Sequence, residues 1–465
     1  MRGDGRIAWP LVGVFVAIHA IALSNALRHD PRVGYDAENH LKYVETLSVF
    51  RLPSPEDTAE FYSPPAPYLA PALARALGLT SGSAARFGLI LNVLYSVGLT
   101  CYLMKICERA RPGADDLKLA SLGLIGILPV YYRTFAFIRG EPLLAAAAVF
   151  VAHEAIALFI DGDRRPMRTI RLGLGLGLAI LSRQFGLLLV PAVGALAVAQ
   201  AVRRPQERAF HLKRAAAALA LAAVAGGWFY AHLGLRHVSA GAFSRTVVRD
   251  TSLSNNPLEF YVDLGLDKFF TDPVRNAFPN RLIPTFYSDV WGDYWCYFLI
   301  YGKDIRRGKF ISGYDLGEIL EKKPWPGWLE TNRDSMAAYL GRVNLVSLAP
   351  SAVLACGLAL GFASAIRSAM AGGDGRTRLL AFLFVIVACT AAAFVWYLAA
   401  YPSPQKGRGI KPTYVLQIFP FLCILAGEAL VRLKQWSLRA WRLALAALSL
   451  CAAHNLPVLF TRTTL

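Results

Sequence analysis

The amino-acid sequence predicts an all-α integral membrane protein, a polytopic bundle of about 9–11 transmembrane helices. Composition is the first observation behind this prediction: 55% of the 465 residues are hydrophobic, 17% are charged, and the mean hydropathy is +0.41. Soluble domains carry about 25% charged residues. The second observation is that apolar runs of roughly 17–25 residues, the length needed to cross about 30 Å of hydrocarbon, recur along the chain.

Most of the apolar runs are predicted to span the membrane as single helices. They cover residues 8–27, 87–107, 118–137, 142–160, 215–234, 343–366, 379–401, 412–432 and 443–460. The first run follows basic residues, as in a secretory signal peptide, but it is longer than the roughly 7–15-residue apolar core of such a peptide. We therefore interpret it as a retained span. One further apolar stretch, residues 171–202, is too long for one perpendicular helix and is interrupted near Arg183.

Basic residues predict the orientation. The formal net charge is +18, and most Lys and Arg lie in short loops between apolar runs, which in membrane proteins stay in the cytoplasm. Both flanks of residues 171–202 are basic, so we expect this stretch to enter the membrane and return, as two spans or as a shallower hairpin. With a cytoplasmic N-terminus, two large loops, residues 28–86 and 235–342, lie outside and carry amphipathic helices. Residues 1–465 then form a single polytopic domain without a nucleic-acid-binding motif.

The first large loop contains the strongest candidate for a catalytic residue, Asp36. Residues 36–50 are amphipathic at helical period, with Asp36, His40 and Tyr43 on neighbouring positions of one face. Such a helix lies along the membrane surface. A carboxylate there can accept a proton from a hydroxyl if the low dielectric raises its pKa. The alternative is that Asp36 is the N-cap of the helix, a position that Asp favours.

Three neighbours of Asp36 are further candidates. Glu38 is a second candidate catalytic carboxylate, although an exposed pair with Lys42, four residues later, also explains it. His40 is expected to hold a substrate hydroxyl or a phosphate, or to face the membrane interface. Tyr62, in an aromatic-proline run, is expected to contact the sugar or the acceptor. Asp36 with Glu38 or His40 can also hold a divalent cation, so metal dependence stays open.

Cations expected outside the cytoplasm are candidate phosphate ligands, because Arg supplies a fork of donors and Lys a point charge. They are Arg139, Arg183, Lys406, Arg408 and Lys411. Glu141 is a candidate contact for the sugar or the acceptor. Arg139 and Glu141 flank a tight link between two spans and can instead form an ion pair with each other. Arg183 at membrane depth faces a cavity or snorkels to the interface. The loop with the last three cations also suits contacts with lipid headgroups.

Aromatic residues beside carboxylates suggest a sugar-binding surface. The segment from Pro284 to Phe298 contains Asp289, Trp291 and Asp293. Such side chains suit stacking on a sugar ring and recognition of its hydroxyls, and they suit an aromatic belt at the membrane interface equally well. Tyr414, in the late basic-aromatic-proline segment, is another candidate contact for sugar or acceptor.

Taken together, these motifs resemble the GT-C superfamily of integral membrane glycosyltransferases, which use polyprenyl-phosphate sugars. The nearest likeness is to the bacterial branch related to protein O-mannosyltransferases and lipid A aminoarabinose transferases. The matching features are an aspartate after the first span (Asp36), an aromatic-Pro-Pro run in the same loop (residues 61–68), an Arg-x-Glu link (residues 139–141), the broken span with LSRQFGLLLVPA (residues 181–192) and a late KPTYVLQIFP (residues 411–420). They are short but spread over nearly the whole chain.

The resemblance implies an inverting glycosyltransferase of the bacterial inner membrane, with its active site facing the periplasm. Asp36 would act as the base, the five cations would bind the lipid phosphate, and residues 235–342 would recognise a glycan, lipid or protein acceptor. Two departures from the family pattern stand out: Ala37 separates Asp36 from Glu38, and Lys411 with Thr413 replaces a common Arg. A transporter or flippase of a polyprenyl-phosphate-linked lipid is the rival class, since it would use the same cations and broken helices.

Overall fold

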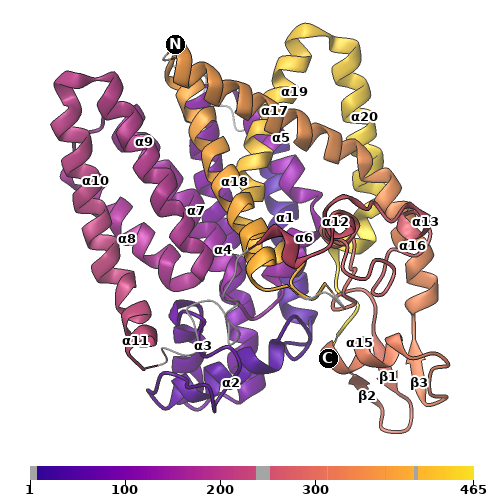
Figure 1. The fold of residues 1–465 in the computed structure, drawn as a ribbon. Coiled ribbons are helices and arrows are strands. Elements are labelled where there is room, and N and C mark those ends of the chain that lie inside the picture. Colours follow the sequence, from indigo (N-terminus) through magenta and orange to yellow (C-terminus); the bar gives the residue numbers. More distant parts are fainter. Residues whose placement is uncertain (1–7, 237–251, 312, 372, 403–406, 465) are drawn as a thin grey trace.

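Membrane-crossing helices form the body of the protein (Figure 1). The computed structural model describes residues 8–236, 252–311, 313–371, 373–402 and 407–464. At one end of the bundle, here called the upper end, lie the N-terminus and the turns between α9 and α10 and between α19 and α20. The other end, called the lower end, carries α2, α3, α15 and three short strands.

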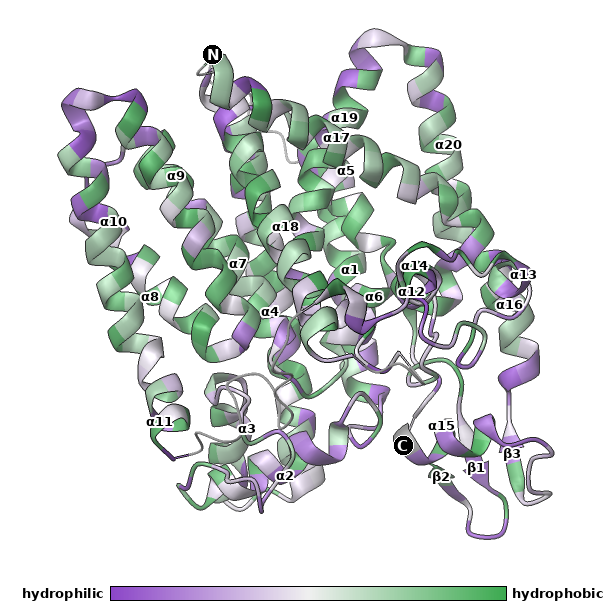
Figure 2. Cartoon of the chain, in the orientation of Figure 1, coloured by the Kyte–Doolittle hydropathy of each residue, from purple (hydrophilic) through white to green (hydrophobic). Residues whose placement is uncertain are grey.

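The helices of the bundle follow the predicted apolar runs. In chain order they are α1 (Trp9–Arg28), α4 (Ser81–Ala110), α5 (Asp115–Gly126), α6 (Pro129–Phe135), α7 (Glu141–Ala155), α8 (Pro166–Ser182), α9 (Leu189–Arg203), α10 (Arg208–Ala222), α11 (Trp228–Arg236), α17 (Leu348–Ala371), α18 (Gly375–Ala400), α19 (Phe419–Trp436) and α20 (Leu438–Asn455). Among the described residues, nine helical segments are long and apolar enough to cross a membrane, and apolar residues dominate the bundle in Figure 2. The chain is therefore a multi-pass membrane protein, and the predicted fold class is confirmed.

The lower end is built by the two loops that the sequence predicts on one side of the membrane. The first loop forms α2 (Ala37–Ser48) and α3 (Ala66–Ala76). The second forms α12 (Leu258–Val262), α13 (Leu266–Phe269), α14 (Leu282–Trp291), α15 (Gly313–Glu321), α16 (Arg333–Val346) and the strands β1 (Gly302–Asp304), β2 (Lys309–Ile311) and β3 (Leu329–Thr331). The strands form an antiparallel sheet in the order β2-β1-β3. This small sheet was not predicted from the sequence.

Two of the predicted spans that differ from the observed helices are divided for clear local reasons. The run 118–137 is divided into α5 and α6, because Pro129 has no backbone N–H to donate and restricts Leu128 to an extended conformation (φ −91°, ψ 107°). The stretch 171–202 is divided at Arg183, which is extended (φ −162°, ψ 156°). The chain then returns through the 3₁₀ segment η2 (Gln184–Leu188) and α9. Arg183 consequently lies at a turn between two helices.

Close packing around α7 and α8 forms the centre of the bundle. Nearly every side chain of α7 is buried, and α7 packs on both α4 and α8. Small residues let the helices approach: a Cβ added at Gly177 of α8 would lie 2.7 Å from Cβ of Ala225, in the π-helical turn between α10 and α11. Such close contacts between small residues replace the hydrophobic effect as the source of helix association in membranes.

The last described residues join distant parts of the lower end. Asn25 near the end of α1 donates to the carbonyl oxygen of Leu459 (2.7 Å) and accepts from the backbone N–H of Thr461 (2.9 Å). The backbone N–H of Arg462 donates to the carbonyl oxygen of Phe298 (2.8 Å), and His29 and Thr464 form an isolated antiparallel bridge. Residues 459–464 therefore hold the end of α1 against the second loop.

The contact at Gly177 gives a stability prediction. Gly177→Val should lower the free energy of unfolding by about 1–3 kcal/mol, because the added carbon atoms have no space beside Ala225. Gly194→Val in α9 is the matched control, since a Cβ there meets nothing within 4 Å. Thermal unfolding of the two variants in detergent measures the difference, and equal melting temperatures would contradict the packing argument.

Candidate active site

Asp36 is presented to the bundle by an unusual backbone conformation. It stands immediately before α2, at the N-cap position, with φ of 56° and ψ of 25°. This left-handed region is uncommon for residues other than Gly, although Asp tolerates it. The Asp36 side chain makes no capping hydrogen bond; its Oδ2 lies 2.9 Å from Nζ of Lys411. The N-cap alternative therefore describes the position of Asp36 but not the role of its carboxylate.

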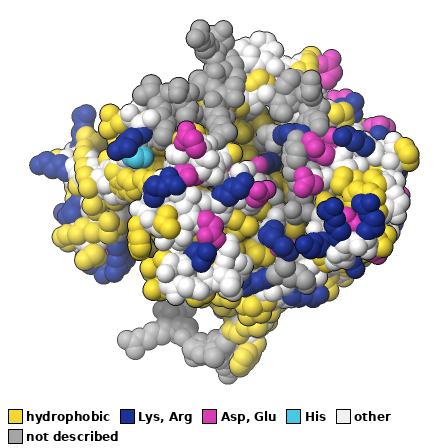
Figure 3. Space-filling model, turned by 90° about the horizontal axis from the view of Figure 1, so that it is seen from below, with side chains coloured by type: hydrophobic (Ala, Val, Ile, Leu, Met, Phe, Trp, Pro, Cys, Tyr) yellow, Lys and Arg dark blue, Asp and Glu magenta, His cyan; other side chains and the backbone are white. Residues whose placement is uncertain are grey.

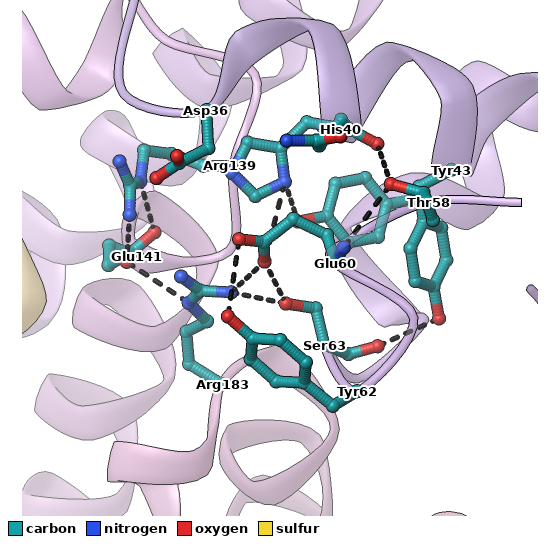
Figure 4. A network of polar contacts seen from close by, with 12 residues as sticks. Asp36, His40, Tyr43, Thr58, Glu60, Tyr62, Ser63, Arg139, Glu141 and Arg183 are labelled. Carbon is teal, nitrogen blue, oxygen red and sulfur yellow. Dashed lines mark hydrogen bonds and ion pairs between the residues drawn. The ribbon is translucent and has the colours of Figure 1, made fainter. Parts of the chain in front are cut away.

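A buried network of ion pairs lies behind Asp36 (Figure 4). Arg139 binds Glu141 with two hydrogen bonds, of 2.6 and 2.7 Å. Arg183 donates to the same carboxylate (3.0 Å) and reaches Glu60 of the first loop (3.1 Å). Ser63 hydrogen-bonds to both Arg183 and Glu60. The network joins the first loop, the start of α7 and the turn after α8 at one place.

Two tyrosine rings enclose the cations nearest to Asp36. The guanidinium carbon of Arg139 lies 5.5 Å from the ring centres of both Tyr35 and Tyr414. Nζ of Lys411 lies 5.1 and 5.6 Å from the same two centres. Cations at these distances are attracted by the ring faces. Tyr414 belongs to the 3₁₀ segment η7 (Pro412–Ile418) and is stacked on Phe185, so the predicted contact residue lies in the middle of the site.

His40 lies one helical turn after Asp36, beside Glu60, and is buried (Figure 4). The hydroxyl of Tyr68 lies 2.8 Å from its Nδ1, and Oε2 of Glu60 lies 3.9 Å from the same atom. Burial lowers the pKa of His40 to about 4, even though the carboxylate of Glu60 acts in the opposite direction. The imidazole is therefore neutral at pH 7. Tyr62 is half-buried, with its hydroxyl 3.5 Å from Glu60.

The predicted residues of the second loop form a separate buried cluster around Arg133 of α6. Oδ2 of Asp289 accepts from Tyr35 (2.7 Å) and pairs with Arg133 (2.9 Å). Asp293 accepts hydrogen bonds from the backbone N–H groups of four successive residues, 297 to 300, at 2.7–3.2 Å. Both carboxylates are fully buried, so their contacts support the loop. Because Tyr35 directly precedes Asp36, its hydrogen bond to Asp289 also helps to fix the position of Asp36.

Other predicted residues lie away from the network. Glu38 has a side chain 79% exposed and pairs with Lys42 at 2.8 Å, so the structure does not bring it beside Asp36. Arg408 is partly exposed and lies 3.9 Å from Glu318. Trp291 is buried and lines an apolar cavity between α14, α17, α18 and α19. Lys406 lies outside the described residues.

The charge state of Asp36 differs from the expectation based on dielectric alone. Lys411 is the largest influence and lowers the pKa of Asp36 well below its ordinary value, more than burial raises it. Asp36 is therefore an ion-paired carboxylate at neutral pH and, in this state, a weak base. The condition named for a base, that the low dielectric raises the pKa of the carboxylate, is therefore not met while Asp36 is paired with Lys411.

Metal binding was left open from the sequence. The described part of the chain has no group of three or more His, Cys, Asp or Glu side chains placed to hold a metal ion. The nearest charged partner of Asp36 is a cation, Lys411, and Glu38 points away. The donor set around Asp36 therefore suits an anion better than a cation.

Sequence reasoning missed two central residues, Glu60 and Arg133. Glu60 directly precedes the aromatic-proline run, and a single acid beside such a run resembles an ordinary loop residue. Arg133 had a usable signal: it is a charge inside a predicted apolar span, where charged residues are rare and usually functional or paired.

Seen from below, the lower end is a charged surface. Figure 3 shows Lys and Arg side chains mixed with Asp and Glu across the middle of this face, with apolar side chains towards its edge. Asp36 keeps 41% of its side chain exposed, whereas Glu60 and Glu141 keep 6% and 0%. Asp36 is therefore the carboxylate of the network that a ligand approaching from outside meets first.

Comparison with known proteins gives matches among solved structures. No family model and no curated protein matches the sequence. Six solved chains match the structure. ArnT from Cupriavidus metallidurans bound to undecaprenyl phosphate matches 96% of this chain at 15% identity, with a TM-score of 0.47. The oligosaccharyltransferase of Archaeoglobus fulgidus in the apo form matches 97% at 12% identity, with a TM-score of 0.47.

These two solved proteins are longer than this chain, which spans 64% of the ArnT chain and 56% of the oligosaccharyltransferase chain. At this level of similarity only the arrangement of helices is compared. The chemistry proposed below is argued from the residues of the site.

Burial of His40 gives a pH prediction. The unfolded chain binds a proton at this histidine near its ordinary pKa of 6.5, whereas the folded protein does so only near 4. The contribution of the neutral, buried His40 to the free energy of unfolding is therefore fully present above pH 6.5. It is lost as the pH drops towards 4, by about 3 kcal/mol for this one group. His40→Gln should flatten that decline. Burial also lowers the pKa of His29 to about 4, so part of the acid-induced decline should remain in this variant.

Unfolding temperatures of wild type and His40→Gln, measured between pH 7.5 and 4.5 in detergent, test this prediction. The expected result is a smaller acid-induced loss in the variant. Parallel pH curves would show that His40 titrates normally in the folded protein.

Proposed function

We propose that this protein is an inverting glycosyltransferase that moves a sugar from a polyprenyl-phosphate donor to a hydroxyl acceptor. Asp36 acts as the base, and Lys411 and the Arg139 side of the network stabilise the leaving lipid phosphate. The observation that carries the proposal is the ion pair between Asp36 and Lys411 at the exposed edge of the buried ion network. The ammonium group of Lys411 also contacts the rings of Tyr35 and Tyr414. The reaction would take place on the extracytoplasmic face, at the lower end.

The balance of charge in the network supports a phosphate ligand. Among the described residues, three cations (Arg139, Arg183 and Lys411) are matched by three carboxylates (Asp36, Glu60 and Glu141). His40 is neutral at pH 7. A lipid phosphate adds negative charge, so it must draw one cation away from its carboxylate.

Lys411 is the cation most available for this exchange. Arg139 and Arg183 are buried and bound to carboxylates that are almost fully buried as well. Lys411 holds Asp36 through one contact, and Asp36 is partly exposed. When Lys411 turns to the donor phosphate, Asp36 loses the interaction that lowers its pKa most. Its affinity for a proton then rises when the donor is in place.

In the proposed reaction, Asp36 accepts the proton of the acceptor hydroxyl as the acceptor oxygen attacks the anomeric carbon of the sugar. The bond between that carbon and the phosphate oxygen breaks, and the phosphate leaves as an anion held by Lys411 and the neighbouring arginines. A phosphate is a good leaving group, so a general acid is not required. One displacement inverts the configuration of the sugar.

A cavity next to the site suits the isoprenoid chain of the donor. It has a volume of about 410 Å³ and is lined almost entirely by apolar side chains of α14, α17, α18, η7 and α19. Val415 and Ile418 of η7 line it, and η7 begins directly after Lys411. A lipid with its phosphate at Lys411 can thus place the first part of its tail between these helices.

The proposed base gives a direct prediction. Asp36→Asn should lower the rate of sugar transfer at least about 100-fold, since a positioned base contributes that much. Glu38→Gln is the matched control, because Glu38 is exposed and paired with Lys42, and it should leave the rate close to wild type. The measurement is transfer of label in proteoliposomes from a panel of radiolabelled undecaprenyl-phosphate sugars to extracted envelope lipids and glycans.

Two outcomes would count against the proposal. Transfer by Asp36→Asn at the wild-type rate would remove Asp36 as the base. Label that changes leaflet without entering a new product, equally in wild type and Asp36→Asn, would favour the flippase alternative.

The exchange of Lys411 gives a second prediction. In wild type, the acid limb of kcat/KM should lie below pH 4, because Lys411 holds the pKa of Asp36 in the free protein below its ordinary value. Lys411→Met removes the cation that stabilises the carboxylate, so the acid limb should move to higher pH and KM for the donor should rise about tenfold or more. Lys411→Arg should keep the limb near its wild-type position. An unchanged acid limb in Lys411→Met would mean that Lys411 does not control Asp36.

A further inference from the structure

The end of α9, the end of α17 and the start of α18 lie at the upper end, opposite the candidate active site (Figure 1). A groove lies between these three helices. Its volume is about 230 Å³, and most of its lining is apolar. The polar residues that line it are Gln200 and Arg203 of α9, Ser368 of α17 and Arg378 of α18. The groove therefore combines an apolar floor with a small group of hydrogen-bond donors.

The two arginines of the groove lack carboxylate partners. Arg203 donates to the backbone carbonyl of Ser368, and Arg378 donates to Oε1 of Gln200 at 2.9 Å. Both arginines are half-buried, and neither forms an ion pair with any acidic residue that the structure describes. The acid that precedes α18, Asp374, accepts from Nε of Arg378 only at its backbone carbonyl (3.4 Å), while its carboxylate caps the helix by accepting from the N–H of Thr377 (2.8 Å).

Other arginines at the same end, both half-buried and exposed, are paired with acids. Glu428, fully buried, binds Arg111, Arg376 and Arg432. Glu154 binds Arg168 at 2.8 Å. A general excess of basic residues at this end therefore does not explain why Arg203 and Arg378 face the groove without an acid.

Gln200 is the second, independent observation. Its side chain is 1% exposed, and its Nε2 has no hydrogen-bond partner in the described structure, although its Oε1 is occupied by Arg378. A buried N–H group without a partner is costly, about 1–3 kcal/mol. All three polar side chains thus offer donors, and an acceptor with negative charge would satisfy them together.

We propose that the groove between α9, α17 and α18 binds an anionic phospholipid, with its phosphate at Arg203, Arg378 and Gln200 and part of one acyl chain along the alanines between the helices. The groove lies among membrane-crossing helices, and its apolar lining includes Ala195, Ala199, Ala365 and Ala369. Those apolar surfaces favour a lipid over a soluble anion. This lipid would fill the gap between α9 and the α17–α18 pair.

Native mass spectrometry of the full chain, released from nanodiscs of phosphatidylglycerol or of phosphatidylcholine, tests the proposal. Wild type should retain phosphatidylglycerol and lose phosphatidylcholine. The double variant R203Q/R378Q should retain phosphatidylglycerol roughly 30-fold less strongly, since each basic residue near a lipid surface contributes about a fivefold effect. R439Q/R442Q is the matched control: both of these arginines are exposed on α20 at the same end, and retention should not change.

Equal retention of the two lipids by wild type would overturn the proposal, and so would an equal loss in the control variant. Displacement of the lipid by excess inorganic phosphate would also overturn it, because it would identify the site as one for a soluble anion. If R203Q/R378Q does not fold, Gln200→Leu decides: it removes an uncharged donor, so weaker retention supports the lipid site and unchanged retention contradicts it.

Discussion

The lower end of the protein depends on one interaction, the sharing of Glu141 between Arg139 and Arg183. Breaking a buried ion pair leaves an uncompensated charge, which costs about 3–5 kcal/mol. Because Arg183 also binds Glu60, the first loop is held to the turn after α8 by the same charges. Tyr414 lies against both arginines, which fixes the start of η7 and therefore Lys411. The position of Asp36 relative to Lys411 follows from these contacts.

Such a network is an expensive way to hold a loop in place, and its composition suggests why it is used. Apolar packing would hold the loop without leaving donors for a ligand. Arginines between carboxylates and tyrosine rings keep positive charge in a fixed place, next to an exposed aspartate, without requiring water to solvate it. A preorganised arrangement of this kind stabilises an anion without reorganising when the anion forms.

The sequence was sufficient for the class of fold and for parts of the site, for identifiable reasons. Apolar runs specify helices because the membrane satisfies no backbone polar groups, and charged residues beside them, such as Arg139 and Arg183, are conspicuous. The break at Arg183 was visible as an interruption in an apolar stretch. In contrast, the ion pair between Asp36 and Lys411 joins residues 375 positions apart, and no local pattern encodes it. Glu38 and Asp293 are carboxylates, as a site of this kind requires, but the structure gives them other roles. Glu38 is exposed and pairs with Lys42, whereas Asp293 accepts hydrogen bonds from four backbone N–H groups.

The contacts of residues 459–464 have a consequence for how the protein is made. The ribosome delivers residues in order, so Asn25 and His29 cannot bind Leu459, Thr461 and Thr464 until every helix between them has been synthesised. In the same way, Asp36 has no ion-pair partner until Lys411 has been synthesised. During synthesis, the first loop therefore carries an unpaired aspartate and polar groups that are buried only in the finished protein. Assembly of the lower end is a late event in biogenesis, and until then the nascent chain depends on solvent or on a chaperone to satisfy those groups.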